Sequence, residues 1–290
     1  MVISHNLSAH NANRMYGIMA ENNAKLAEKL SSGYRINRGA DDAAGLSISE
    51  KMRRQIRGLN QAVMNAQDGI SMVQSAEGAL QQMHEIVQRG NELAIKAANG
   101  TMSDEDRELL DKEFQQIKNA LDDASHNTVF NEMKLFPSDG EKPSGTSSTN
   151  HIIKFQVGAE TGVTIDTKLY NMDAKSLGLE DTNVKTEDDA DQAIDDLKQA
   201  LEDISKVRGY YGSIQNRLEH TVNNLNNVIE NTTAAESLIR DSDMAKTMVQ
   251  YANSNILLQA GQAVLAQANQ SKAFVLDLLR GPMNTKMSNI

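Results

Sequence analysis

The sequence contains no cysteine and no tryptophan, and only three of its 290 residues are proline. Without cysteine, neither a disulfide framework nor a cysteine-ligated metal site can form. So few prolines exclude collagen-like and proline-rich chains. Aromatic residues make up only 4% of the chain, so bulky rings cannot fill a wide core. These absences favour long, narrow contacts between helices.

Basic residues are too few for a general nucleic-acid-binding protein. Lysine and arginine total 29 against 39 acidic residues, a net charge of −10, whereas phosphate binding requires a basic surface. The cluster of Lys51, Arg53, Arg54 and Arg57 has no interleaved aromatic residue to stack on bases. We interpret it as a contact for an acidic region of a neighbouring subunit. The acidic run 187–196 is a candidate for that region, and a solvated helix start explains the run equally well.

Long apolar runs and a signal-peptide pattern are also missing. Nothing approaches the roughly 20 apolar residues that a membrane-spanning helix needs. The first ten residues lack a basic segment followed by an apolar run, so they do not resemble a secretory signal peptide. We therefore expect no membrane insertion. The protein is expected to be cytosolic or to be exported without a cleaved signal peptide.

Helical periodicity dominates what is present. The composition of 137–151, with Pro137 and Pro143, indicates a loop between two long helical halves. In the second half an apolar seam at 3,4 spacing predicts a coiled-coil helix on the order of 65 Å long. It follows Leu197, Ala200, Ile204, Val207, Tyr211, Ile214, Leu218, Thr221, Leu225, Val228, Thr232, Ala235 and Ile239.

The first half supplies a matching seam, which Glu77 and His84 interrupt. Its members are Ile56, Leu59, Val63, Ala66, Ile70, Val73, Leu80 and Val87. Ser103, with acidic residues after it, predicts the start of a further helix. Two apolar stretches, 152–158 and 161–165, predict a β-hairpin near 152–166. The expected fold is mainly α, a long antiparallel coiled-coil helical bundle with a small hairpin.

The ends of the chain differ from its middle. Residues 1–32 and 244–279 are amphipathic but rich in Ala, Asn and Gln, so neither buries enough surface to order itself. We expect 1–44 and 240–290 to pair as a terminal coiled coil that folds on assembly with other copies. Residues 45–239 would then form a helical rod.

Five segments resemble the signatures of bacterial flagellin. They are ISHNLSA at 3–9, LSSGYRINRGADDAAGL at 30–46, MDAKSLGL at 172–179, SLIRDSDMA at 237–245 and LAQANQ at 265–270. The resemblance implies a flagellar filament subunit with only the two conserved layers, the terminal pair forming the inner one. It also implies type III export to the extracellular flagellum. Implied partners are other copies of the chain, an export chaperone, the filament cap and the hook junction proteins.

The resemblance further implies which residues contact neighbouring subunits. They are Ile3, Leu7, Leu30, Arg35, Asn37, Arg38, Asp41, Asp42, Arg54, Leu265, Leu276 and Leu279. Two features depart from the family pattern. Residues 271–273 replace a usual proline, and 281–290 follow the point where family chains normally stop, so this tail is expected to affect polymerisation.

A second implied site is a patch sensed by vertebrate Toll-like receptor 5. Arg89, Leu93 and Glu113 match family positions, and Arg89 and Leu93 share one helix face as residues i and i+4. Gly90 and Asn91 depart from the bulkier residues common there. The alternative interpretation is that this face packs against a neighbouring subunit in the filament.

No motif indicates catalysis or a cofactor. His84 and Glu85 begin a zinc-protease pattern, but Gln88 replaces its second histidine. The run 187–196 lacks the glycine and terminal glutamate of a calcium loop. We therefore expect a structural protein and no enzyme. The rival hypotheses are a hook–filament junction protein and a secreted coiled-coil effector that does not polymerise.

Overall fold

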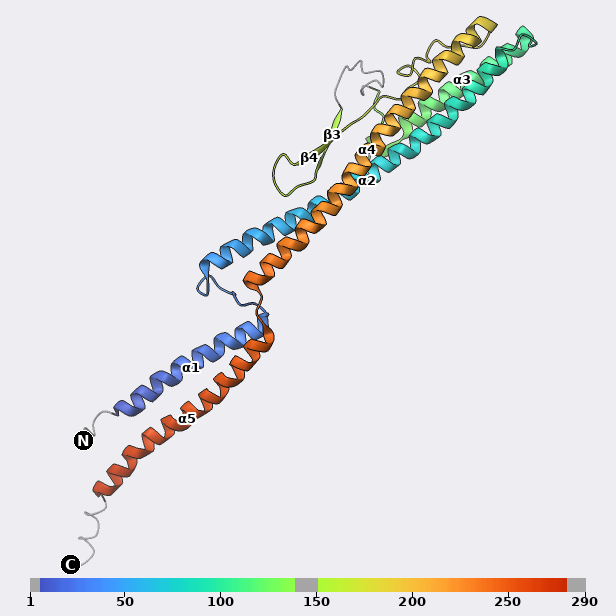
Figure 1. Cartoon of the computed structure of the whole chain (residues 1–290). Coiled ribbons are helices and arrows are strands. Elements are labelled where there is room, and N and C mark those ends of the chain that lie inside the picture. The colour runs from blue at the N-terminus through green and yellow to red at the C-terminus, as the bar shows by residue number, and fades with distance from the viewer. Residues whose placement is uncertain (1–5, 139–150, 281–290) are drawn as a thin grey trace, which may run out of the picture. The chain divides into compact units, whose positions relative to one another are not determined.

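A computed structural model of the chain describes residues 6–138 and 151–280 (Figure 1). In this part of the chain the elements are α1 (Leu7–Ser32), α2 (Ala43–Ala97), α3 (Asp104–Asn127), β1 (Val129–Phe130), β2 (Met133–Lys134), β3 (Ile152–Gln156), β4 (Thr164–Lys168), α4 (Glu187–Arg240) and α5 (Met244–Arg280). The side chains of Lys272 and of residues 275–280 lie outside the description. The mainly α class with a small hairpin is confirmed.

The chain divides into two compact units. Unit 1 comprises residues 1–53 and 232–290, and unit 2 comprises residues 54–231. Helices α2 and α4 each contribute residues to both units. The expected layer boundaries at 44 and 240 lie near the start of α2 and at the end of α4, not at the division between the two units. The assignment of these layers in the filament stays a proposal.

Side-chain caps explain why the helices start where they do. Asn6 accepts a hydrogen bond from the backbone N–H of Ala9 at 3.0 Å, and Ser103 accepts one from Asp106 at 3.2 Å. Thr186 likewise accepts from Asp189 at 3.1 Å before α4. These oxygens satisfy N–H groups that have no partner inside the first helical turn. The predicted start at Ser103 is confirmed.

The core of unit 2 follows the predicted seam of α4. Its residues from Leu197 to Leu218 at 3,4 spacing are buried, as is Leu225, and beyond this point the seam is only half-buried. Opposite them lie the α2 residues Val73, Leu80 and Val87, with α3 beside both helices (Figure 1). The long helices pack through narrow apolar stripes, as the low aromatic content predicts.

The expectation that Glu77 and His84 interrupt the α2 seam was wrong. Ala76 and Met83 are fully buried beside them and carry the 3,4 spacing onward without a break. Gly90 and Ala94 extend it toward the end of the helix. The α2 seam alternates steps of three and four residues and has small residues at several of these positions.

The two long helices run antiparallel in unit 2. Leu59 clusters with Leu225, whereas Gly90, much later in α2, lies near Leu197 at the start of the α4 seam. Between these levels Glu77 lies 3.8 Å from Arg208. Residue numbers increase along α2 as those of their partners in α4 decrease, so the two helices are antiparallel.

The predicted hairpin is confirmed as β3 and β4, with a later second strand. Ile152 pairs with Lys168 and Gln156 with Thr164. Gly162, at φ +89°, turns the chain in a conformation that favours glycine. The second strand therefore begins at Thr164 rather than Thr161. The hairpin is placed on α2 by Phe155, whose ring lies beside Gly69.

A second, shorter hairpin was not predicted. β1 and β2 are joined by Asn131 and Glu132, both at positive φ (48° and 66°). Two-residue turns of this kind prefer Asn-Gly. Glutamate in the glycine position hides that signal.

Candidate assembly surface

Helices α1 and α5 of unit 1 pair side by side (Figure 1). They leave much apolar surface uncovered. No residue of α1 is buried, and Leu7 is 77% exposed. Among the described side chains of the two helices, the exposed large apolar residues are Leu7, Met15, Ile18, Met244, Met248, Val249, Ile256, Leu257, Val264 and Phe274. We call these ten residues the terminal apolar face. Exposed apolar surface on this scale marks a binding site for another protein surface.

Polar contacts fix how α1 and α5 lie against each other. The Asn23 side-chain amide donates a hydrogen bond to Asn255 Oδ1 at 2.7 Å, and Asn6 donates to the backbone oxygen of Ala268 at 3.1 Å. Gly261 lies against Met19, which lets the helices approach closely. These two hydrogen bonds help to set the register of an antiparallel pair.

The two connections within unit 1 are joined to each other by backbone hydrogen bonds. Tyr34 and Asp241 form an isolated antiparallel bridge. Arg35 N–H donates to Arg240 O at 2.7 Å, and Ser242 N–H donates to Gly33 O at 2.9 Å. The segment after α1 and the segment before α5 are therefore held as a pair.

Side chains reinforce this backbone bridge. The Arg240 guanidinium lies 4.8 Å from the centre of the Tyr34 ring. The same group donates to Glu50 at 2.7 Å and lowers the pKa of that carboxyl. A cation over an aromatic ring and a charge-assisted hydrogen bond thus act at one arginine.

Most of the predicted interface residues near 35–42 make contacts inside the subunit. Arg35 donates to the Ile239 backbone oxygen, and Arg38 pairs with Glu28 at 3.0 Å. Asp41 accepts backbone N–H groups of Arg38 and Asn37 at 3.1 and 3.2 Å, which lowers the pKa of its carboxyl. These contacts shape the connection that any neighbouring subunit would meet.

The remaining predicted interface residues are spread over unit 1 and α2. Asp42 caps α2 by accepting the Gly45 N–H at 2.9 Å. Leu7 and Arg54 are exposed, and Leu30 and Leu265 are half-buried. The predicted contact Ile3 lies outside the described residues, and the side chains of Leu276 and Leu279 are outside the description as well.

The predicted receptor patch is divided between surface and core. Arg89 is exposed and pairs with Glu92 and with Glu113 of α3, both at 3.0 Å; these carboxylates raise the pKa of the guanidinium. Leu93 is only 3% exposed. Leu93 lies one turn from Arg89 but is buried, because side chains of α3 and α4 cover this part of α2.

A shallow groove between α2 and α3 runs beside Arg89. It holds about 550 Å³, and its lining consists of Gln82, Glu85, Ile86, Arg89, Glu113, Gln116, Ile117 and Ala120. Its apolar floor and charged rim are typical of a surface that meets another protein.

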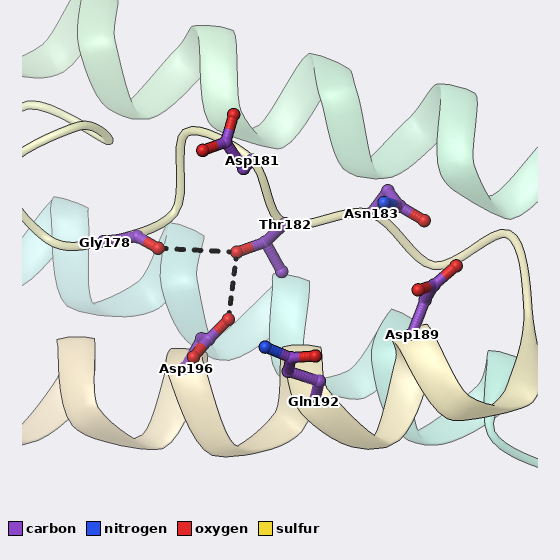
Figure 2. Close-up of a pocket in the computed structure, with 7 residues that line it drawn as sticks. All are labelled: Gly178, Asp181, Thr182, Asn183, Asp189, Gln192 and Asp196. Atoms are coloured by element: carbon purple, nitrogen blue, oxygen red, sulfur yellow. Dashed lines mark hydrogen bonds between the residues drawn. The ribbon is translucent and has the colours of Figure 1, made fainter.

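A polar pocket of about 320 Å³ lies at the start of α4 (Figure 2). Thr182 lies 3.2 Å from the Asp196 carboxylate and 3.5 Å from the Gly178 backbone oxygen. Lys118 of α3 donates to the backbone oxygens of Glu180 and Thr182 at 2.7 and 3.0 Å. Burial lowers the pKa of this lysine. These contacts hold the loop before α4 against the rod.

One arrangement that sequence reasoning missed joins Ser125, His126 and Asp173. The Ser125 hydroxyl donates to Asp173 at 2.9 Å, and His126 Nε2 lies 3.5 Å from the same oxygen. A hydrolase triad needs the serine to bond the histidine, whereas here both contact the carboxylate. The arrangement ties the end of α3 to the 171–176 segment, and no local sequence pattern signals it.

His84, the first residue of the incomplete zinc-protease pattern, is half-buried on α2. Within residues 6–138 and 151–280, no group of three or more histidine or acidic residues could hold a metal ion. No helix in the same part of the chain is both long and apolar enough to cross a bilayer. A fold of long paired helices with an uncovered terminal face defines an assembling structural protein.

Comparison with known proteins gives the family. The bacterial flagellin N-terminal helical region matches residues 3–140, and the bacterial flagellin C-terminal helical region matches residues 194–279. The chain belongs to the bacterial flagellin family, whose members are structural proteins rather than enzymes.

The similar proteins cover nearly the whole chain. A flagellin of Halalkalibacterium halodurans is 48% identical over 282 residues, which is 97% of this chain and 100% of the relative. The flagellar filament 33 kDa core protein of Treponema phagedenis is 44% identical over 286 residues, with the same coverage of 97% and 100%. The crystal structure of Bacillus cereus flagellin aligns with a TM-score of 0.47 and 32% identity, covering 56% of this chain and 88% of that one.

Proposed function

We propose that this chain polymerises into the extracellular flagellar filament through unit 1. The terminal apolar face carries the proposal, because ten large apolar side chains stay exposed on α1 and α5. Burial of apolar surface against further copies stabilises an assembly at roughly 25 cal/mol per Å². The relatives named for the flagellar filament support the same conclusion.

Export and partners follow from the family. We infer passage through the flagellar type III pathway without a cleaved signal peptide. The chain would then meet an export chaperone before transit and the filament cap and hook junction proteins at the growing tip. Terminal helices that bury little surface in a single subunit suit transit as an unfolded chain.

Seeded polymerisation tests the proposal. Purified chain is examined by negative-stain electron microscopy before and after addition of filament seeds, next to a variant that ends at Arg280. Long filaments from both chains support the proposal and make residues 281–290 a tolerated tail. Filaments from the shortened variant alone identify the tail as a block on polymerisation. No filaments from either chain would favour the hook-junction or effector hypotheses.

A second proposed function is recognition by Toll-like receptor 5. The exposed Arg89–Glu113 pair beside the α2–α3 groove favours it, since arginine and an apolar floor are common at protein interfaces. Leu93 would act indirectly, by packing α2 against the core. If neighbouring subunits cover this groove in the filament, the receptor can bind only the monomer.

Receptor-reporter cells treated with monomer test this second function. Arg89→Ala should reduce activation several-fold, whereas Lys198→Ala, which removes one exposed charge from α4, should not. Equal activation by both variants and the unaltered chain would contradict a receptor contact at Arg89.

A further inference from the structure

Methionine is the only residue through which sulfur chemistry can act on this chain. It has 14 methionines, whereas cysteine and tryptophan are absent. In most proteins low-pKa thiolates are sensitive targets of oxidants, and methionine thioethers are also oxidised. Because no thiol competes here, peroxide that reaches this protein acts on methionine.

Exposure decides which methionines react. Met15 of α1 and Met244 and Met248 of α5 lie on the terminal apolar face, and Met248 is 63% exposed. By contrast, Met72, Met83 and Met172 are at most 2% exposed in the core of unit 2. Two further exposed methionines, Met64 and Met133, lie in unit 2 and offer an internal comparison.

The exposed methionines of unit 1 have apolar neighbours on the helix surface. Met244 and Met248 are one turn apart on α5, and Met15 lies three residues from Ile18 on α1. Residues at these spacings share a helix face. These thioethers therefore belong to the surface that another copy must cover during polymerisation.

We propose that Met15, Met244 and Met248 form a reversible oxidation site through which peroxide blocks polymerisation of the free subunit. This inference rests on the proposed function. The thioether sulfur attacks one peroxide oxygen and the O–O bond breaks. The sulfur gains that oxygen and loses two electrons, and the peroxide is reduced to water. Methionine sulfoxide reductases reverse the change.

The block follows from the polarity of the product. A sulfoxide is a strong hydrogen-bond acceptor, and burying it in an apolar contact leaves that oxygen without a donor. The rod is spared, because its core methionines are out of reach of the oxidant. Oxidation therefore removes subunits from assembly without unfolding unit 2.

The test compares four chains with and without hydrogen peroxide. They are the unaltered chain, Met248→Leu, the triple variant Met15→Leu/Met244→Leu/Met248→Leu, and the control Met64→Leu/Met133→Leu. Leucine keeps apolar volume but cannot be oxidised. Peptide mass spectrometry locates each gain of about 16 Da, sedimentation after seeding measures filament, and tyrosine near-UV circular dichroism follows unit 2.

We expect peroxide to reduce sedimented filament several-fold in the unaltered chain and in the control. The triple variant should polymerise as if untreated, Met248→Leu should be partly protected, and reductase should restore the unaltered chain. Equal loss in the triple variant, protection by the control, or no sulfoxide at the three positions would overturn the proposal. Failure of the proposed function looks different, because the untreated chain would then form no filament.

Discussion

Four of the five glycines in α2 allow the same change to alanine in different surroundings. We predict that Gly90→Ala raises the free energy of unfolding of unit 2 by roughly 1.5–2 kcal/mol. A Cβ at this position would lie 3.5 Å from side-chain carbons of Phe114, Ile117 and Leu197, which is ordinary contact distance. Alanine gains about 1 kcal/mol over glycine in helix propensity, and a buried methyl adds about 0.8 kcal/mol.

The other glycines separate these two contributions. Gly78 has nothing within 4 Å of its ideal Cβ, so Gly78→Ala should add only the propensity gain of about 1 kcal/mol. At Gly69 the new methyl would lie 3.1–3.2 Å from the Phe155 ring. Gly69→Ala should therefore gain less than Gly78→Ala or become destabilising, because the β3–β4 hairpin must shift. Gly58→Ala should behave like Gly69→Ala, since the methyl would lie 2.8 Å from the Cβ of Ala159.

Urea and thermal unfolding, followed by near-UV circular dichroism, measure the series. The cluster of Tyr170, Tyr210 and Tyr211 gives a signal from unit 2, with ring centres 5.5–6.4 Å apart. For a unit of this size each kcal/mol corresponds to about 2–4 °C in melting temperature. The reasoning fails if Gly78→Ala stabilises as much as Gly90→Ala, or if Gly69→Ala matches Gly78→Ala.

Three further predictions concern other parts of the chain. Glu132→Gly should stabilise by about 1 kcal/mol in urea unfolding, since a side chain at φ 66° is strained; an unchanged midpoint would contradict the strain. Burial raises the pKa of Tyr211. Above about pH 10 the unfolded chain therefore loses this proton while the folded chain keeps it, and the free energy of unfolding falls as the pH rises. Tyr211→Phe should lose less stability than the unaltered chain between about pH 9 and 11, and parallel losses would refute this. Replacing both Asn23 and Asn255 by leucine should let α1 and α5 slip in register. Since the chain has no native cysteine, disulfide cross-links between cysteine pairs introduced on the two helices would report the register. Cross-links in the native register alone would count against a register role for the two asparagines.

The sequence predicts the long helices well because their packing is periodic. The α4 seam, the start of α3 at Ser103 and the β3–β4 hairpin are all confirmed, and each depends on residues close together in the chain. Apolar spacing and capping residues carry this local information.

Features that depend on distant segments could not be predicted in the same way. The i, i+4 spacing of Arg89 and Leu93 does not show that Leu93 is buried, because the burial comes from α3 and α4, which are distant in sequence. Ser125 hydrogen-bonds Asp173, which lies 48 positions later, and Tyr34 forms a backbone bridge with Asp241 although the whole of α2, α3 and α4 separates them in sequence. Their residue types are ordinary, so only the fold brings them together.

The bridge between Tyr34 and Asp241 has a mechanical consequence. Unit 1 contains two covalent crossings, one between α1 and α2 and one between α4 and α5, and the bridge joins them at the same level. A force on either terminal helix is therefore shared by the two connecting strands of chain. Shear across the bridge strains three interactions at once: the backbone hydrogen bonds, the Arg240–Glu50 pair and the Arg240–Tyr34 ring contact. A filament subunit under load gains from such a joint, because neither strand carries the force alone.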